Sequence, residues 1–287
     1  MDKYFDIIEH SFFDYANYLY FELSNLSWHN YLYWLIGLSL LVWLIELLFP
    51  WRKEQAAFRK DFWLDAFYML FNFFLFSLTG FNALSNVGVN LFHDFLSLFG
   101  YKNIVALHIE HWPRWAKFIT IFVVADFIQW NIHRMLHRFP FLWRFHKVHH
   151  SVEEMGFAAH LRFHWMESVI YKSIQYVPLA MIGFGLEDFF IVHIFTLAIG
   201  HLNHANIKLT YGPLKYVFNN PVMHLWHHAY EMPKGREQGV NFGLSLSIWD
   251  YLFHTAYIPD EKGSIKLGFK GVEKFPKGFL SQFKNPF

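Results

Sequence analysis

The chain of 287 residues contains no cysteine. This absence excludes disulfide bonds, iron–sulfur clusters and haem held by a thiolate, because each of them needs cysteine sulfur. Charged residues make up only 16% of the chain, against roughly 25% in soluble domains. The net charge of +1 does not by itself imply an acidic partner such as nucleic acid. The first residues, Met1-Asp-Lys-Tyr-Phe-Asp, are acidic and aromatic, unlike the basic start of a cleavable signal peptide.

Apolar residues are abundant and fall into four long stretches. Hydrophobic residues make up 54% and aromatic residues 22% of the chain, which is typical of a protein that contacts lipid. The stretches predict an all-α, integral membrane helical bundle with about three to five spans. Three are single spans, and the fourth is expected to form a helical hairpin that is fully or partly inserted. They are Tyr31–Phe49, Phe62–Phe81, Phe118–Leu136 and Val169–Gly200.

The loop between the first two stretches carries two basic pairs, Arg52-Lys53 and Arg59-Lys60. Basic residues collect in cytoplasmic loops, so this loop is predicted to be cytoplasmic. Counting spans from there brings the ends of the third and fourth stretches back to the same side. We therefore expect a cytoplasmic, His-rich helical cap on a bacterial inner membrane or on the endoplasmic reticulum. The predicted domains are residues 1–117 with the N-terminal spans, 118–258 with the histidines, and a loosely packed Lys- and Gly-rich tail, 259–287.

Histidine is concentrated in the middle of the chain, where 13 of the 19 fall between His133 and His228. Eight of them form one HxxxH and two HxxHH patterns: His133, His137, His146, His149, His150, His224, His227 and His228. Residues three and four positions apart share a helix face, so each cluster presents its imidazoles together. Eight converging imidazoles are more than one metal ion can use. The pattern predicts two metal ions.

The spacing of the clusters does not identify the metal, because imidazole suits Fe, Zn, Cu and Ni alike. The chain lacks the His-Glu-x-x-His of zinc proteases, and no glutamate is followed three residues later by histidine, as in soluble di-iron carboxylate bundles. A structural zinc site would need four ligands rather than eight. The ligand set is therefore nearly all imidazole.

The three clusters on an apolar chain resemble the fatty acid hydroxylase/sterol desaturase superfamily, and the resemblance runs from about residue 118 to 255. Leu161-Arg-Phe-His164-Trp-Met-Glu167 is similar to the family's Arg-x-His-Pro-x-Glu, with Trp165 in place of proline. Further segments similar to family motifs are His204-Ala-Asn206, Asn241-Phe-Gly243 and Ser247-Ile-Trp-Asp250.

The resemblance implies a membrane-bound non-haem di-iron oxidase that uses O₂ and two electrons to hydroxylate or desaturate a lipid. It implies that the eight clustered histidines bind the irons, with His164 and His204 as the remaining ligands. His160 and His201 compete for those two places, or pack beside them. Carboxylates would orient the imidazole rings. The candidates are Asp126, Glu167 and Asp250, together with Glu153 and Glu154. Asp126 lies two helical turns before His133, and an acid within a membrane span is costly unless it is paired or functional.

The electrons are expected from a separate protein, cytochrome b5-like or ferredoxin-type, because no His-Pro-Gly-Gly segment of cytochrome b5 is present. A basic patch of Arg134, Arg138, Arg144 and Lys147 could dock an acidic donor, although the positive-inside rule explains it equally well. The lipid substrate is expected to enter from the bilayer. Four tryptophans could line its cavity or act as interfacial anchors: Trp130, Trp143, Trp165 and Trp226.

Two other classes of protein stay open at this point. A membrane metal-binding or transport protein would carry acidic and histidine residues through the middle of its spans, whereas here only Asp126 lies deep. A b-type cytochrome would place its histidines on separate spans at matched depth. Three properties stay open within the family. They are the lipid substrate (sterol, fatty-acyl, alkylglycerol or carotenoid), the reaction (hydroxylation, desaturation or ether cleavage) and the oligomeric state.

Overall fold

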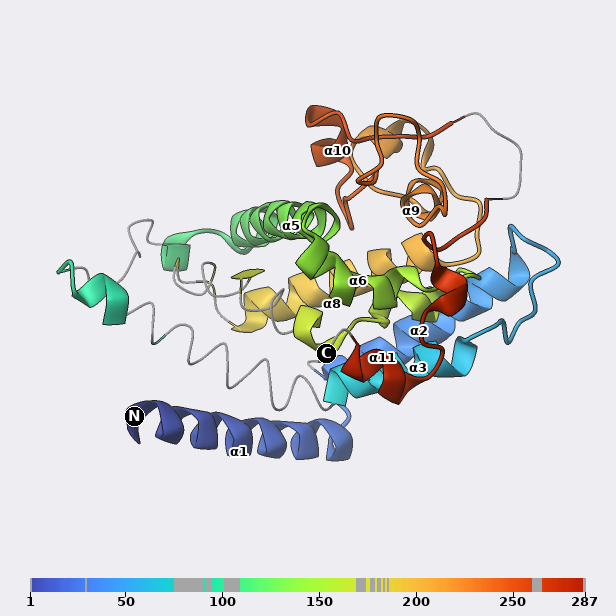
Figure 1. The fold of residues 1–287 in the computed structure, drawn as a ribbon. Coiled ribbons are helices and arrows are strands. Elements are labelled where there is room, and N and C mark those ends of the chain that lie inside the picture. The colour runs from blue at the N-terminus through green and yellow to red at the C-terminus, as the bar shows by residue number, and fades with distance from the viewer. Residues whose placement is uncertain are drawn as a thin grey trace.

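The computed structural model in Figure 1 describes residues 2–28, 30–74, 90, 94–100, 109–168, 174–175, 179, 182, 184, 186–259 and 265–285. All regular secondary structure within these residues is helical, which confirms the all-α prediction. The α-helices are α1 (Asp2–Ser24), α2 (Tyr31–Leu48), α3 (Phe62–Phe71), α5 (Arg114–Arg138), α6 (Pro140–His150), α8 (Leu186–His204), α9 (Pro221–His227), α10 (Ile248–Leu252) and α11 (Phe279–Lys284). Short 3-10 helices are η2 (Ile109–His111), η3 (Phe157–Leu161), η4 (Gly212–Tyr216) and η5 (Val272–Lys274).

The break between α5 and α6 positions the first two histidine clusters. Phe139 has extended backbone angles, as expected for a residue that precedes proline, and Pro140 is the first residue of α6. The chain therefore turns sharply after Arg138, and α5 and α6 contact each other. A second start signal orders the third cluster, because the Asn220 side chain accepts a hydrogen bond from the Met223 N–H at the start of α9.

Helix α8 is the hub of the fold and contacts α2, α5, α9 and η3. In Figure 1, α6 and α8 lie in the middle of the molecule, with α5 and α9 above them and α2 and α3 below. Apolar side chains fill the spaces between these helices. Ile121 of α5 packs in one cluster with Val192 of α8, and Val42 of α2 packs in another with Ile207. Burial of each such side chain contributes about 1.5–3 kcal/mol.

The number of membrane spans stays a prediction. Among the described residues, α2 is the one helix that is long and apolar enough to cross a membrane, and its outward face exposes Leu40, Leu44 and Leu48. Helix α5 covers the third predicted span but does not pass the same test. The end of the second predicted span, from residue 75, and most of the first half of the predicted hairpin lie outside the described residues.

The C-terminal tail is packed from residue 265 onward, so the prediction of a loose tail is wrong there. Phe275 is buried against Val148 of α6 and Tyr68 of α3. Phe279 of α11 lies against the ring of Tyr68, and the Tyr68 hydroxyl donates a hydrogen bond to the buried Gln282. Phe275, Phe279 and Tyr68 thus hold the tail against the helices, although the tail is rich in lysine and glycine.

A buried ion network joins the loop before α3 to η3. Arg59 and Arg162 both donate to the Asp65 carboxylate, at 2.5 Å and 3.0 Å, and Arg162 also contacts Asp61 at 3.2 Å. Arg162 and Asp65 are completely buried. Charges buried this deeply are tolerated only when they are paired, so the network fixes the position of η3 beside the histidine clusters.

We predict that Asp65→Asn lowers the free energy of unfolding by about 3–5 kcal/mol, because two buried guanidinium groups would lose their carboxylate. Glu153→Gln is the matched control. Glu153 bonds Lys60 and Lys277 on the surface, and its loss should cost under about 1 kcal/mol. Thermal unfolding in detergent measures both variants. Equal melting temperatures would contradict a structural role for the network.

Candidate metal centre

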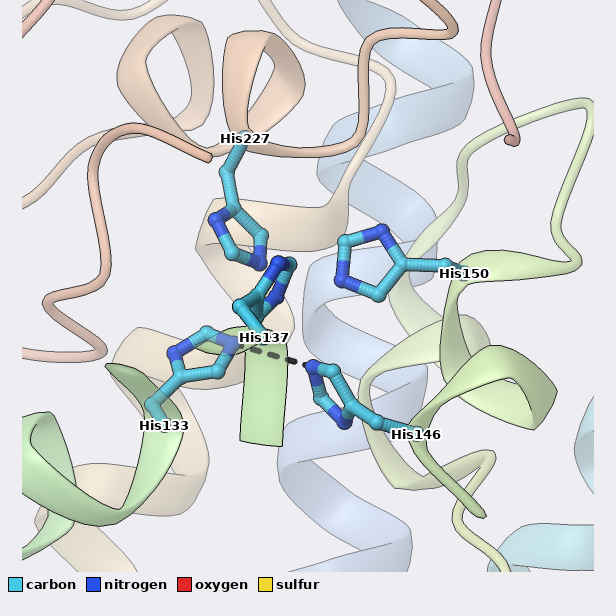
Figure 2. A group of neighbouring side chains, drawn as sticks. All are labelled: His133, His137, His146, His150 and His227. Carbon is cyan, nitrogen blue, oxygen red and sulfur yellow. Dashed lines mark hydrogen bonds between the residues drawn. The ribbon is translucent and has the colours of Figure 1, made fainter. Parts of the chain in front are cut away.

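Nine histidines from four segments of the chain meet in two groups. The first group is His133, His137, His146, His150 and His227, and the second is His149, His204, His224 and His228. Within each group, one ring nitrogen from every member lies within 4.8 Å of the others. Figure 2 shows the five rings of the first group pointing toward one another from α5, α6 and α9. The groups share helix α6, because His146 and His150 belong to the first and His149 to the second.

The spacing of the ring nitrogens matches a shared coordination sphere. In the second group, the Nε2 atom of His224 lies 2.9 Å from that of His204 and 3.2 Å from that of His228. The Nε2 atoms of His204 and His149 are 3.3 Å apart. Ligand nitrogens about 2.0–2.1 Å from one metal ion lie about 2.9 Å apart at right angles and about 3.3 Å apart in a tetrahedron. The measured distances fall in this interval.

Backbone carbonyls fix the orientation of three of the rings. The Nδ1–H of His133 donates to the Phe242 carbonyl at 2.7 Å, and that of His227 donates to the Val240 carbonyl at 2.8 Å. The Nδ1–H of His204 donates to the Gly200 carbonyl at 2.7 Å. A proton on Nδ1 leaves the lone pair on Nε2, which is the atom directed at the group. These contacts select the tautomer that a metal ligand needs.

Asn241 explains how two neighbouring carbonyls reach two different histidines. Its φ of 53° lies in the left-handed region, which asparagine tolerates better than most residues. The residues on either side of it, Val240 and Phe242, supply the two acceptors. The Asn241 side chain holds the turn by donating to the carbonyls of Met223 and Tyr257, both at 2.8 Å.

Of the carboxylates predicted to orient the rings, Glu167 contacts a histidine directly. Its Oε2 atom lies 2.5 Å from Nδ1 of His146, and both side chains are buried. Burial raises the pKa of the Glu167 carboxyl well above its ordinary value and lowers the pKa of His146 well below its own. With the proton on Nδ1, His146 donates to the Glu167 carboxylate and keeps the lone pair of its Nε2 free for a metal.

Asp250 and Asp126 contact backbone N–H groups and tryptophan indoles rather than a histidine ring. Asp250 accepts hydrogen bonds from the N–H groups of Phe242 and Gly243 at 2.9 Å and 2.8 Å, so it fixes the peptide whose carbonyl holds His133. Asp126 accepts from the N–H of Ser245, the N–H of Leu246 and the Trp249 indole. Glu153 and Glu154 bond Lys60 and Lys277 near the surface.

His204 lies in the second group, as expected, but His164 lies in neither group. Its Nε2–H donates to the Phe283 carbonyl at 2.9 Å, and its Nδ1 accepts from the Met166 N–H. His160 and His201 face each other, with their Nδ1 atoms 3.3 Å apart. The Nε2 of His201 contacts Ser39 at 3.1 Å. Nine of the ten predicted ligands therefore lie in the two groups, and His164 does not. His160 and His201 pack behind His204.

The chemistry of the two groups suits metal ions. Burial lowers the pKa of His224, His227 and His228 well below the ordinary value, so their imidazoles are neutral at pH 7. Neutral imidazole is the ligand form. Six ring nitrogens of the nine histidines are buried without a hydrogen-bond partner among the described residues. Bound metal ions would satisfy those that face the groups, including Nε2 of His137 and His150.

A largely apolar cavity reaches both groups from the side of α2, α3, α5 and α8. Its wall includes the rings of His133, His146, His149, His204 and His224. The remaining lining is mainly apolar, and its members include Tyr31, Leu35, Met69, Phe73, Ala125, Phe163, Phe189, Val192 and Leu197. The cavity therefore offers an apolar chain a path between the helices to the metal-binding rings.

The four tryptophans, for which cavity lining and interfacial anchoring were both open, do not line this cavity. Trp130 is buried and donates its indole N–H to Asp250 at 3.1 Å. Trp143 packs against the first histidine group, whereas Trp165 and Trp226 contact residues of the C-terminal part of the chain. The aromatic residues that do line the cavity were not singled out by sequence, because nothing distinguishes them from the other aromatic residues of this Phe-rich chain.

Comparison with known proteins places the site in a recognised domain. The model of the fatty acid hydroxylase family matches residues 118–255, which contain all nine clustered histidines. An ornithine lipid hydroxylase, OlsE, from Rhizobium tropici is 34% identical over 178 residues, covering 62% of this chain and 52% of that protein. Human alkylglycerol monooxygenase is 29% identical over 196 residues, covering 63% of this chain and 42% of the human protein.

A third relative is the very-long-chain aldehyde decarbonylase GL1-10 of Oryza sativa subsp. japonica, which is 27% identical over 143 residues, covering 49% of this chain and 46% of that protein. The chain thus spans about half the length, or less, of these three relatives. No solved structure gives a significant match.

We predict that Glu167→Gln weakens metal binding by about 10–100-fold, because the side chain that orients His146 would lose its carboxylate while keeping its shape. Glu154→Gln, which removes a carboxylate that binds the Lys60 N–H instead of a histidine, should leave the affinity unchanged. Competition with a chelator measures both. The same affinity in both variants would show that Glu167 does not support the site.

Proposed function

Because the chain belongs to the fatty acid hydroxylase superfamily, we propose that it is a membrane-bound lipid oxidase that uses O₂ and two irons. The observation that carries this proposal is the meeting of nine neutral imidazoles in two groups at the inner end of an apolar cavity. The cavity gives a lipid chain access, and the two groups give each of two metal ions four or five nitrogen ligands.

Iron is the metal we propose for both groups. The five histidines of the first group and the four of the second would hold one ion each. Cysteine is absent from the chain, so no thiolate can bind the ions. The Glu167 carboxylate contacts the His146 ring, and it would act on the iron through that ring. Neutral imidazoles would hold the metal ions without compensating their positive charge. Bound irons would supply the activation of O₂.

The reaction requires two electrons and two protons besides O₂. In a hydroxylation, a lipid C–H bond becomes C–OH and the second oxygen atom leaves as water; in a desaturation, both oxygen atoms leave as water. The protein holds the substrate and excludes bulk water. Asp250 and Asn241 keep the carbonyls that orient His133 and His227 in place. A separate one-electron carrier, cytochrome b5-like or ferredoxin-type, would supply the electrons.

The substrate we propose is a membrane lipid with a long aliphatic chain. The relatives are named for ornithine lipids, alkylglycerols and very-long-chain aldehydes, which share such a chain. The lining of the cavity is consistent with this class, because most of the surface that it exposes is apolar. We further propose that the histidine groups lie on the cytoplasmic side of the membrane.

Two competing functions fit the geometry less well. A b-type cytochrome needs a gap between axial histidines for a planar macrocycle, whereas four Nε2 atoms of the second group lie within 4.8 Å of one another. A metal transporter needs ligands along a path through the membrane. Here the two groups share α6 and lie side by side.

The proposal is tested by lipid extracts of cells that express the chain under labelled O₂. We expect a lipid that carries one labelled oxygen atom, or one additional double bond, together with two irons per chain in the purified protein. His228→Asn should remove iron from the second group and abolish the product. His164→Asn is the matched control and should keep both irons, because His164 lies outside the groups. Equal iron loss in both variants would return His164 to the ligand set, and product without iron would refute the proposal.

A further inference from the structure

The first histidine group is reached from two different directions. The substrate cavity touches two of its rings, His133 and His146, but neither His137 nor His150 lines it. These two rings contact Trp143 instead, with ring centroids 5.0 Å and 5.1 Å apart. Trp143 is half-buried and also lies 6.0 Å from His146. One aromatic side chain therefore joins three rings of the first group to the protein surface on a side that the substrate does not use.

The surface around Trp143 is basic. Lys147 is one helical turn after Trp143 on α6, and its Nζ lies 5.4 Å from the ring of Phe269, which in turn packs on Trp143 at 5.9 Å. Arg138 is the last residue of α5, Arg144 follows Trp143 in α6, and Lys270 follows Phe269 in the sequence; all three are exposed. None of these four cations forms an ion pair within the described part of the chain.

Acidic residues do not cancel this charge. The segment 265–277, which carries Phe269, contains four lysines and one glutamate. The loop 229–240 contacts His137 through the backbone of Gln238. Its charges cancel, because Glu231 and Glu237 are matched by Lys234 and Arg236. The face around Trp143 therefore attracts a negatively charged partner.

We propose that this face, centred on Trp143 and rimmed by Arg138, Arg144, Lys147 and Lys270, is the docking site of an acidic one-electron carrier protein. The inference rests on the proposed function and locates the partner that the function needs. Electron transfer falls off steeply with distance, and Trp143 is the place where ring-to-ring contact continues from the first group to a half-exposed side chain. Two successive encounters deliver the two electrons, and each oxidises one carrier molecule by one electron.

A small and charged interface suits such a carrier. Electron-transfer encounters are among the smallest specific protein contacts, and complementary charge raises their association rate at low salt. Because Trp143 does not line the substrate cavity, the carrier can dock there while the lipid is bound. The separation of the two approaches thus explains why basic residues surround Trp143 and are absent from the cavity lining.

The test measures reduction of the iron-loaded protein in anaerobic stopped-flow experiments. One reductant is a plant-type [2Fe–2S] ferredoxin, which is strongly acidic, and the other is the small viologen radical. In Lys147→Glu, we expect the second-order rate with ferredoxin to fall about tenfold at low salt, and the viologen rate to stay unchanged. The wild-type rate with ferredoxin should fall as salt is added.

Lys215→Glu is the matched control. Lys215 is also half-buried with its Nζ 5.3 Å from an aromatic ring, that of Tyr216, but it lies in η4 beside α10. Binding of oxidised ferredoxin to the metal-free protein gives a second measurement that does not depend on iron, and it should weaken in Lys147→Glu alone.

Three outcomes would overturn the docking site. The ferredoxin rates of Lys147→Glu and Lys215→Glu could be equal, the ferredoxin could fail to reduce a protein that viologen reduces, or Lys147→Glu could impair only attachment to anionic vesicles, which would assign the face to lipid headgroups. A chain that takes up no iron refutes the proposed function instead, and the binding measurement on metal-free protein still decides the docking site.

Discussion

The structure depends on nine imidazoles that are packed together and removed from water. A buried ring nitrogen without a partner costs about 1–3 kcal/mol, and six such nitrogens occur among these histidines within the described residues. Their summed cost is comparable to the total stability of a protein domain, about 5–15 kcal/mol. A metal ion in the first group would satisfy three of these nitrogens, the Nε2 atoms of His137, His150 and His227. Folding and metal binding are therefore expected to be coupled.

The rest of the fold serves to hold these rings in place. Pro140 turns the chain so that the histidines of α5 and α6 face each other, and Asn241 directs two neighbouring carbonyls to two different rings. Asp250 fixes one of these carbonyls from behind, and the buried ion network at Asp65 fixes η3. None of these residues belongs to the two histidine groups, yet each determines where a ring nitrogen points or what packs behind it.

The site is open to different molecules on different sides. The apolar cavity between α2, α5 and α8 leads to rings of both groups, among them His133, His146 and His204, and the basic face around Trp143 leads to His137 and His150. This division would separate the apolar substrate and the charged partner that we propose, by the chemistry of the surface that each meets. A single approach would have to be apolar for the lipid and charged for the carrier at once.

Much of this arrangement could be predicted from the sequence, because helical spacing places the members of HxxxH and HxxHH on one face. The sequence did not separate His164 from His204, since both belong to family-like segments; the carbonyl of Phe283, 119 residues away, decides the orientation of His164. The carbonyl acceptors of His133 and His227 carry no sequence signal, because every residue has a carbonyl. The lysine and glycine content of the tail likewise gave no indication that Phe275 packs it against the helices.

The central claim is that the two groups bind two irons through imidazole. X-ray absorption at the iron edge, together with elemental analysis of the purified protein, tests it most directly. We expect two irons per chain, nitrogen and oxygen neighbours without sulfur, and the multiple scattering of several imidazoles at each iron. One metal ion per chain, or an iron surrounded by a porphyrin, would contradict the account.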